Sequence, residues 1–153
     1  MERGDAEVEI RRIGLDYAAA LDDCRPGLLD RIFAEDAVWR NGDDRRRGIR
    51  QIRLIPERLA ARWLRTVHRI HNQRVEFDDD GASATTYCTA DHLQRREDGD
   101  LEVYTVTIRY DDRLRFDGSW RIIERVLRVE WTERRPVAAW VGPVMPPDRV
   151  PLE

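Results

Sequence analysis

Apolar residues recur at every third or fourth position in the first part of the chain, which is the spacing of an amphipathic helix. Within residues 7–22, the apolar positions on one helical face are Ile10, Ile13, Tyr17 and Leu21. A helix is expected there, and Pro26 would stop it. Further helices are expected over residues 27–37 and 48–63, with a short strand between them, and Pro56 should break or bend the later helix.

The rest of the chain consists of long runs rich in β-branched and aromatic residues, separated by Asp-Gly turns. These runs cover residues 67–77, 82–94, 101–116 and 120–132. Helices followed by an antiparallel meander predict an α+β domain in which the helices cover one face of a curved sheet. We expect this domain to span residues 1–133. Residues 134–153, with five prolines from Pro136 onward, should form an irregular tail.

The composition excludes several classes of function. A chain of 153 residues is expected to form one domain, and no apolar run approaches the length of a membrane span. The polar N-terminal segment does not resemble a secretory signal, so we expect a cytoplasmic protein. All 27 basic residues are arginine, which excludes a Schiff-base lysine and a P-loop lysine. The net charge is −3 with both signs interspersed, so we expect no nucleic-acid partner. The two cysteines indicate neither a disulfide framework nor a zinc site.

Two charged residues stand where apolar or uncharged ones are expected. Alternation along the last strand places five residues on one face, namely Ile123, Arg125, Leu127, Val129 and Trp131. A buried guanidinium needs a partner, so Arg125 either pairs with a carboxylate or faces a polar ligand. Asp22 lies at the C-terminal end of the first predicted helix, where the helix dipole disfavours a carboxylate. It is either a loop residue or an acceptor for an imidazolium.

The strand over residues 67–77 carries two of the three histidines in the chain. His68 shares a face with Ile70, whereas Val75 and Phe77 have the opposite parity. A bulge near His71 would turn all four of the other side chains inward and leave His71 close to solvent. An inward His68 is then either a core residue or a base.

Taken together, these segments resemble a known family. A Tyr-x4-Asp pair (Tyr17 and Asp22) closes the first helix, and it is followed by the segments AEDAVW, TVHRIHNQRVEF and YDDRLRFDGSWRI and by a final strand with an arginine. Over residues 7–133 this succession resembles the SnoaL-like branch of the nuclear transport factor 2-like superfamily. That superfamily includes ketosteroid isomerase, scytalone dehydratase, bile-acid 7α-dehydratase and lindane dehydrochlorinase. The resemblance implies a cystatin-like cone.

The resemblance also implies roles for individual residues. His68 matches the base of the dehydratase and dehydrochlorinase members, and Asp22 matches the aspartate that orients it. Tyr17 would donate a hydrogen bond to a substrate oxygen, and Arg125 matches the arginine of the final strand. Asp91 would be the acidic residue that the bile-acid enzymes carry on the second strand.

Two features of the relatives have no clear match. The second catalytic histidine of scytalone dehydratase has no firm counterpart, although His92 is close to its place. The aspartate base of ketosteroid isomerase is not evident.

The function expected from the residues and the resemblance is proton abstraction from carbon by an Asp–His pair. This is the chemistry of a cofactor-independent lyase or isomerase of the dehydratase or dehydrohalogenase type, with no metal. The substrate should be a small apolar cyclic molecule that carries an oxygen function. The residues expected to bind it are Asp91, Trp39, Trp63, Tyr104 and Trp131.

Two alternatives remain open. The chain could be a non-catalytic ligand-binding or assembly module of the same fold. It could also be a cyclase or epoxide hydrolase that uses Asp91 and Arg125 and leaves His68 idle. In each case we expect a homodimer or homotrimer, formed through the exposed side of the long strands.

Overall fold

The computed structural model describes residues 3–139. Its helices are α1 (Arg3–Asp22), α2 (Leu29–Ile32), α3 (Ile49–Ile52) and α4 (Leu54–Arg62), and a 3₁₀ turn, η1, covers Pro26–Leu28. Its strands are β1 (Phe33–Asn41), β2 (Asp44–Arg47), β3 (Arg65–Asp78), β4 (Gly81–Arg95), β5 (Leu101–Phe116) and β6 (Trp120–Val137).

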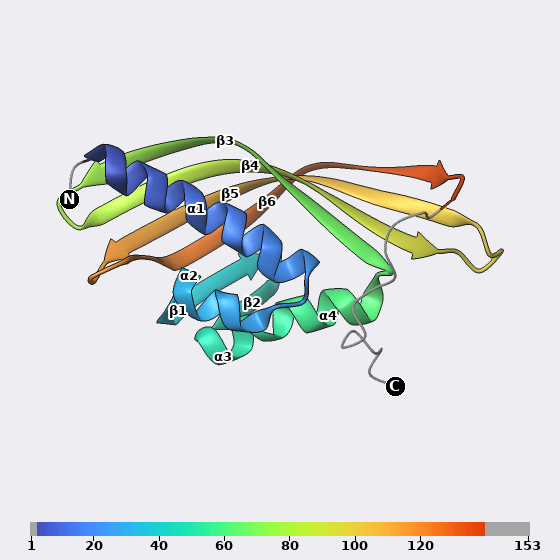
Figure 1. Ribbon diagram of the computed structural model, residues 1–153, viewed down its shortest axis with the longest axis horizontal. Coiled ribbons are helices and arrows are strands. Elements are labelled where there is room, and N and C mark those ends of the chain that lie inside the picture. The colour runs from blue at the N-terminus through green and yellow to red at the C-terminus, as the bar shows by residue number, and fades with distance from the viewer. Residues whose placement is uncertain (1–2, 140–153) are drawn as a thin grey trace.

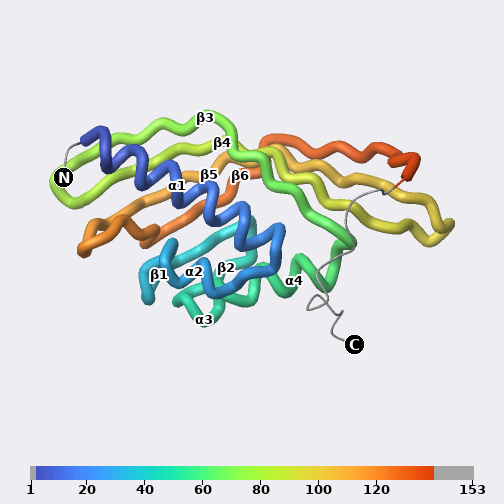
Figure 2. Tube along the Cα trace, viewed as in Figure 1, coloured from blue at the N-terminus to red at the C-terminus, as the bar shows by residue number. Residues whose placement is uncertain are grey.

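Within residues 3–139, the strands form one six-stranded sheet in the order β2-β1-β6-β5-β4-β3. Neighbouring strands are antiparallel except for β1 and β6, which run parallel. The sheet is curved and open, and the helices lie against one of its faces (Figure 1 and Figure 2). We call this helix-covered side the inner face and the opposite side the outer face. The expected α+β class is confirmed.

The first helix is held to the sheet by its predicted apolar stripe. All four residues of the stripe are buried, with Ile10 and Tyr17 each 1% exposed. Burial of one large apolar side chain contributes roughly 1.5–3 kcal/mol, so this stripe alone accounts for a large part of the docking of α1. The docking matters for the site because it carries the C-terminal end of α1, Asp22, to the start of β3.

Two helix predictions were wrong in their bounds. The helix expected over residues 27–37 ends at Ile32, because Phe33 begins β1 and pairs with Ile122 of β6. The helix expected over residues 48–63 is interrupted at Arg53, between α3 and α4, and not at Pro56. Pro56 is the third residue of α4, a position at which a backbone N–H has no partner within the helix.

The bulge expected in β3 is confirmed. Ile70 pairs with Cys88 and Gln73 with Thr86, so two residues of β3 stand opposite one residue of β4 between these pairs. Val75 and Phe77 pack against the core together with Ile70, and His71 is exposed. Because of the bulge, His68 and Ile70 share the inner face with Val75 and Phe77.

The last strand extends beyond the predicted run of residues 120–132 and into the segment expected to be irregular. This strand continues to Val137, which pairs with Leu101 of β5. Pro136 is tolerated there because β1 pairs with β6 only as far as Leu127, and no other strand within residues 3–139 pairs with that edge of β6. The remainder of the expected tail, residues 140–153, lies outside the described residues.

A second bulge in β6 corrects the expected position of Trp131. Val129 pairs with Ile108 and Trp131 with Thr107, so Glu130 is an extra residue that reverses the alternation. Val129 remains on the inner face, whereas Trp131 lies on the outer face and is 60% exposed. The prediction that Trp131 lines the site is therefore wrong.

Candidate active site

A cavity of about 250 Å³ lies between the inner face of the sheet and the helices α1 and α4. It is lined by Tyr17, Leu21, Trp39, Asn41, Ile55, Leu59, Arg62, Trp63, His68, His92, Tyr104, Val106, Ile108, Tyr110, Leu127 and Val129. Most of these side chains are apolar or aromatic. A few polar groups in a mainly apolar concavity are typical of a binding site for a small molecule.

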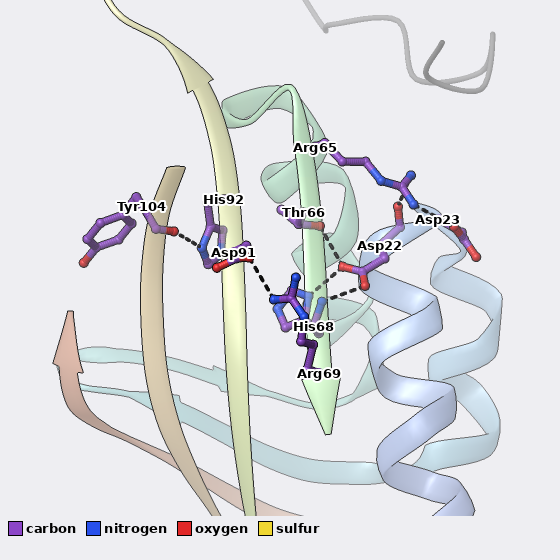
Figure 3. Close-up of polar contacts among 9 residues, drawn as sticks. All are labelled: Asp22, Asp23, Arg65, Thr66, His68, Arg69, Asp91, His92 and Tyr104. Atoms are coloured by element: carbon purple, nitrogen blue, oxygen red, sulfur yellow. Dashed lines mark hydrogen bonds and ion pairs between the residues drawn. The ribbon is translucent and has the colours of Figure 1, made fainter. Parts of the chain in front are cut away.

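The polar centre of the cavity wall is the contact between Asp22 and His68 (Figure 3). Asp22 Oδ1 lies 2.7 Å from His68 Nδ1, and the backbone N–H of His68 donates to Asp22 Oδ2 at 2.8 Å. The two side chains are only 15% and 4% exposed. Because an ionised carboxylate only accepts, neutral His68 carries its proton on Nδ1, and its Nε2 keeps a free lone pair.

Neighbouring groups keep the carboxylate of Asp22 ionised. Thr66 Oγ1 donates to Asp22 Oδ1 at 2.9 Å, and Arg65 donates to the backbone carbonyl of Asp22 at 3.2 Å. Burial raises the pKa of Asp22, but the hydrogen bonds from His68 and Thr66 outweigh it, and the pKa falls below its ordinary value. Asp22 is therefore an anion that fixes the orientation and the tautomer of His68. The prediction that Asp22 and His68 lie within hydrogen-bonding distance is confirmed.

A second histidine, His92, lines the same cavity. Its ring centroid lies 5.9 Å from that of His68, and its Nδ1 donates to the backbone carbonyl of Tyr104 at 3.2 Å. Burial and the neighbouring His68 lower the pKa of His92 to about 4, so it is neutral at pH 7. Its Nε2 is then a second free acceptor beside that of His68.

Alternation along β4 provides a weak sequence signal for the place of His92. Alternate positions of β4 carry small apolar residues, at Ala84, Cys88 and Ala90, and continuing this alternation leads to His92. The positions between them carry Ser, Thr, Tyr and Asp. The small residues mark the inner face of β4, and they place His92 on it.

Tyr17 and Trp39 meet at the wall of the cavity. Trp39 Nε1 donates to Tyr17 Oη at 3.1 Å, and both side chains are buried. Burial raises the pKa of Tyr17, and the positive charge of Arg125 offsets this only in part. Tyr17 is therefore a neutral hydroxyl and a hydrogen-bond donor at ordinary pH.

Arg125 forms the carboxylate pair that was one of its two expected alternatives. Its Nε and Nη2 donate to the two carboxylate oxygens of Asp112, each at 2.7 Å, and the guanidinium is 1% exposed. The guanidinium carbon lies 4.3 Å from the ring centre of Tyr17 and 4.5 Å from that of Tyr110. Arg125 thus supports two cavity tyrosines from behind and does not itself border the cavity.

The expected position of Asp91 in the cavity is wrong. Asp91 lies between Ala90 and His92, which face inward, so its own side chain is on the outer face. There it accepts a hydrogen bond from Arg69 at 2.8 Å (Figure 3). It also accepts one from Thr105 at 2.6 Å.

Trp63 and Tyr104 do line the cavity, as expected. Their rings are stacked with centroids 5.9 Å apart, and Trp63 also lies 5.0 Å from the ring of His92. These flat surfaces stand beside the two imidazoles and suit a planar ligand.

Two further findings concern other kinds of site. Within residues 3–139, no group of three His, Cys, Asp or Glu side chains is arranged to hold a metal ion. None of the helices in that part of the chain is both long and apolar enough to cross a bilayer.

Comparison with solved structures identifies the class of fold. Kfla4162 from Kribbella flavida superimposes with a TM-score of 0.78 at 18% identity, over 86% of this chain and 95% of that one. A hexachlorocyclohexane dehydrochlorinase (LinA) of type 2 gives 0.73 at 20% identity, over 95% and 96% of the two chains. A putative scytalone dehydratase from Novosphingobium aromaticivorans gives 0.71 at 22% identity, over 94% of each chain. Together with a further neighbour described as having a cystatin-like fold, these structures show that the chain has that fold.

The family itself follows from the sequence. Residues 2–126 match the SnoaL-like domain, and the chain belongs to that family. No curated protein matches the chain. At these low identities the structural neighbours establish the fold and not the reaction.

Proposed function

We propose that this protein is a cofactor-independent lyase or isomerase in which His68 removes a proton from a carbon atom of a small ring substrate. The observation that carries the proposal is the 2.7 Å contact between Asp22 and His68, set in the wall of a cavity of about 250 Å³. An imidazole held by a buried carboxylate and open to an apolar cavity is the arrangement of a general base. The dehydrochlorinase and dehydratase among its structural neighbours are in keeping with this class of reaction.

The proposed reaction uses three groups of the chain. His68 Nε2 takes the proton from carbon, and the negative charge of Asp22 stabilises the imidazolium that forms. Tyr17 donates a hydrogen bond to the substrate oxygen as charge develops there. The electron pair left on carbon then expels a leaving group or shifts a double bond. The imidazolium gives its proton to a leaving hydroxyl or to a second carbon, and when a halide ion leaves it gives the proton to solvent. Because the cavity is largely apolar, these interactions are stronger than they would be in water.

The lining of the cavity limits the substrate class. Its volume suits one or two fused rings, and the stacked Trp63 and Tyr104 provide a flat wall for such rings. His92 Nε2 can accept a hydrogen bond from a hydroxyl group of the substrate. We therefore propose a hydroxylated or halogenated ring compound as the substrate.

The role of His68 is tested by comparing the turnover of variants at two histidines of β3, His68 and His71. Ring compounds that carry a hydroxyl or halide leaving group are screened for ligand-induced thermal stabilisation, and those that bind are assayed for turnover. In His68→Gln, kcat should fall by about 10²–10⁴-fold, the usual contribution of a positioned base, while the melting temperature changes little. The matched control is His71→Gln, because His71 is exposed and bonds Thr89 on the outer face.

The outcomes separate this proposal from its rivals. Equal turnover in the wild type and His68→Gln would refute the role of the base. Binding without any turnover of the bound compounds would favour a non-catalytic module. An epoxide hydrolase built on Asp91 and Arg125 has no support, because the two side chains lie apart, one on the outer face and one behind the tyrosines.

A further inference from the structure

The hydroxyl of Tyr17 is approached by two donors, the indole N–H of Trp39 and the guanidinium of Arg125, and both can only donate. Trp39 Nε1 donates to Tyr17 Oη at 3.1 Å, and an indole N–H can only donate. No residue within 3–139 accepts a hydrogen bond from Tyr17 Oη in return. The Tyr17 proton is therefore free for an acceptor that the described chain does not supply, and Tyr17 borders the cavity.

The geometry of a phenol determines in which direction the O–H bond of Tyr17 points. The O–H bond of tyrosine lies close to the ring plane and has two favoured orientations, one on each side of the oxygen. The N–H of Trp39 occupies one side, so the proton must lie on the other. A rotation toward Trp39 would bring two hydrogens together and break the hydrogen bond.

We propose that Trp39 is a positioning residue: its N–H holds the Tyr17 proton toward the cavity and makes the site selective for a ligand oxygen that accepts a hydrogen bond, such as a carbonyl. This inference rests on the proposed function, because it assigns the substrate oxygen to Tyr17 and the acidic C–H to His68. It narrows the substrate class to ring compounds in which a carbonyl stands close to that C–H. The buried guanidinium of Arg125, 4.3 Å over the Tyr17 ring, adds to the donor strength of the hydroxyl.

The experiment measures selectivity rather than affinity. The probes are 1-indanone and indane, bicyclic compounds of similar size that differ in one carbonyl oxygen. Dissociation constants of both are measured by ligand-observed NMR for each variant. The ratio of the indane constant to the indanone constant then reports on the hydrogen bond, because a change in cavity size affects both probes alike.

In Trp39→Phe and in Tyr17→Phe, this ratio should fall roughly 2- to 10-fold from the wild-type value, the worth of one hydrogen bond. Trp120→Phe is the matched control, because it also removes a buried indole N–H, one that has no partner within residues 3–139. Its ratio should equal that of the wild type. If Trp39→Phe does not fold, β-(3-benzothienyl)alanine at position 39 keeps the ring shape and still removes the N–H.

A ratio in the Trp39 variant within twofold of the wild type would overturn the proposal. Failure of the wild-type protein to bind 1-indanone would do the same. His68→Gln separates this inference from the proposed function, since it should lose turnover and keep the wild-type ratio. A Trp39-dependent ratio in a protein without any turnover would support the positioning role and contradict only the reaction.

Discussion

Replacing His92 by glutamine should make the stability of this protein less sensitive to acid. In the folded chain, burial and the charge of His68 lower the pKa of His92 from 6.5 to about 4. In the unfolded chain the same imidazole titrates near its ordinary value. Between these two values the unfolded state binds a proton that the folded state does not. The free energy of unfolding therefore falls as the pH falls from about 6.5 to about 4.

The magnitude follows from the two pKa values. A pKa difference from 6.5 to about 4 corresponds to roughly 3 kcal/mol once the pH has passed both. At pH 5 the unfolded His92 is almost fully protonated and the folded one is almost neutral, so about 2 kcal/mol of stability is lost relative to pH 7.5. His92 is only 7% exposed, so solvent screens this effect little.

Urea unfolding at pH 7.5 and pH 5 measures the effect. The difference between the two pH values should be about 2 kcal/mol larger in the wild type than in His92→Gln, in which the amide can still donate to the Tyr104 carbonyl. His71→Gln is the control, because it removes an exposed histidine and should leave the difference as in the wild type. Equal pH dependence of the wild type and His92→Gln, within about 0.5 kcal/mol, would refute the reasoning.

Two further predictions concern the buried ion pair and the outer face. Arg125→Met should lower the free energy of unfolding by about 3–5 kcal/mol, because the Asp112 carboxylate stays buried without a partner. Combining it with Asp112→Leu should restore most of the loss, and a single-variant loss below about 1 kcal/mol in urea unfolding would contradict this. We also propose that the outer face joins two or three copies of the chain through Trp131, which is 60% exposed. In sedimentation equilibrium, Trp131→Glu should then shift the wild-type oligomer to monomer, and a wild-type protein that stays monomeric at all concentrations would oppose the idea.

Local patterns placed Asp22 and His68 on their elements, and the resemblance to the SnoaL-like family supplied their pairing. An apolar stripe of period 3.6 placed Asp22 at the end of a helix. The change of parity between Ile70 and Val75 required a bulge, and only one location of the bulge turned His68 inward. Alternation along a strand is a strong constraint when one face is buried, and here it determined the inner face.

The same rule failed for Trp131 and Asp91. The bulge at Glu130 reverses the alternation of faces in β6. No buried apolar residue follows Trp131 to show this reversal in the sequence, so regular alternation placed Trp131 on the wrong face. Asp91 was assigned by resemblance, against the small-residue pattern of its own strand. The partner of Arg125 was also out of reach, because the pairing of Asp112 with Arg125 depends on the register between β5 and β6.

The carboxylate of Asp22 also determines how the first helix is held to the sheet. Asp22 is the last residue of α1, and it accepts hydrogen bonds from the Thr66 hydroxyl and from the backbone and ring of His68, all near the start of β3. The carboxylate beside the proposed base therefore also ties the N-terminal helix to the sheet. Substitution of Asp22 should therefore weaken the anchoring of α1 as well as the proposed base, because the same two carboxylate oxygens make both sets of contacts.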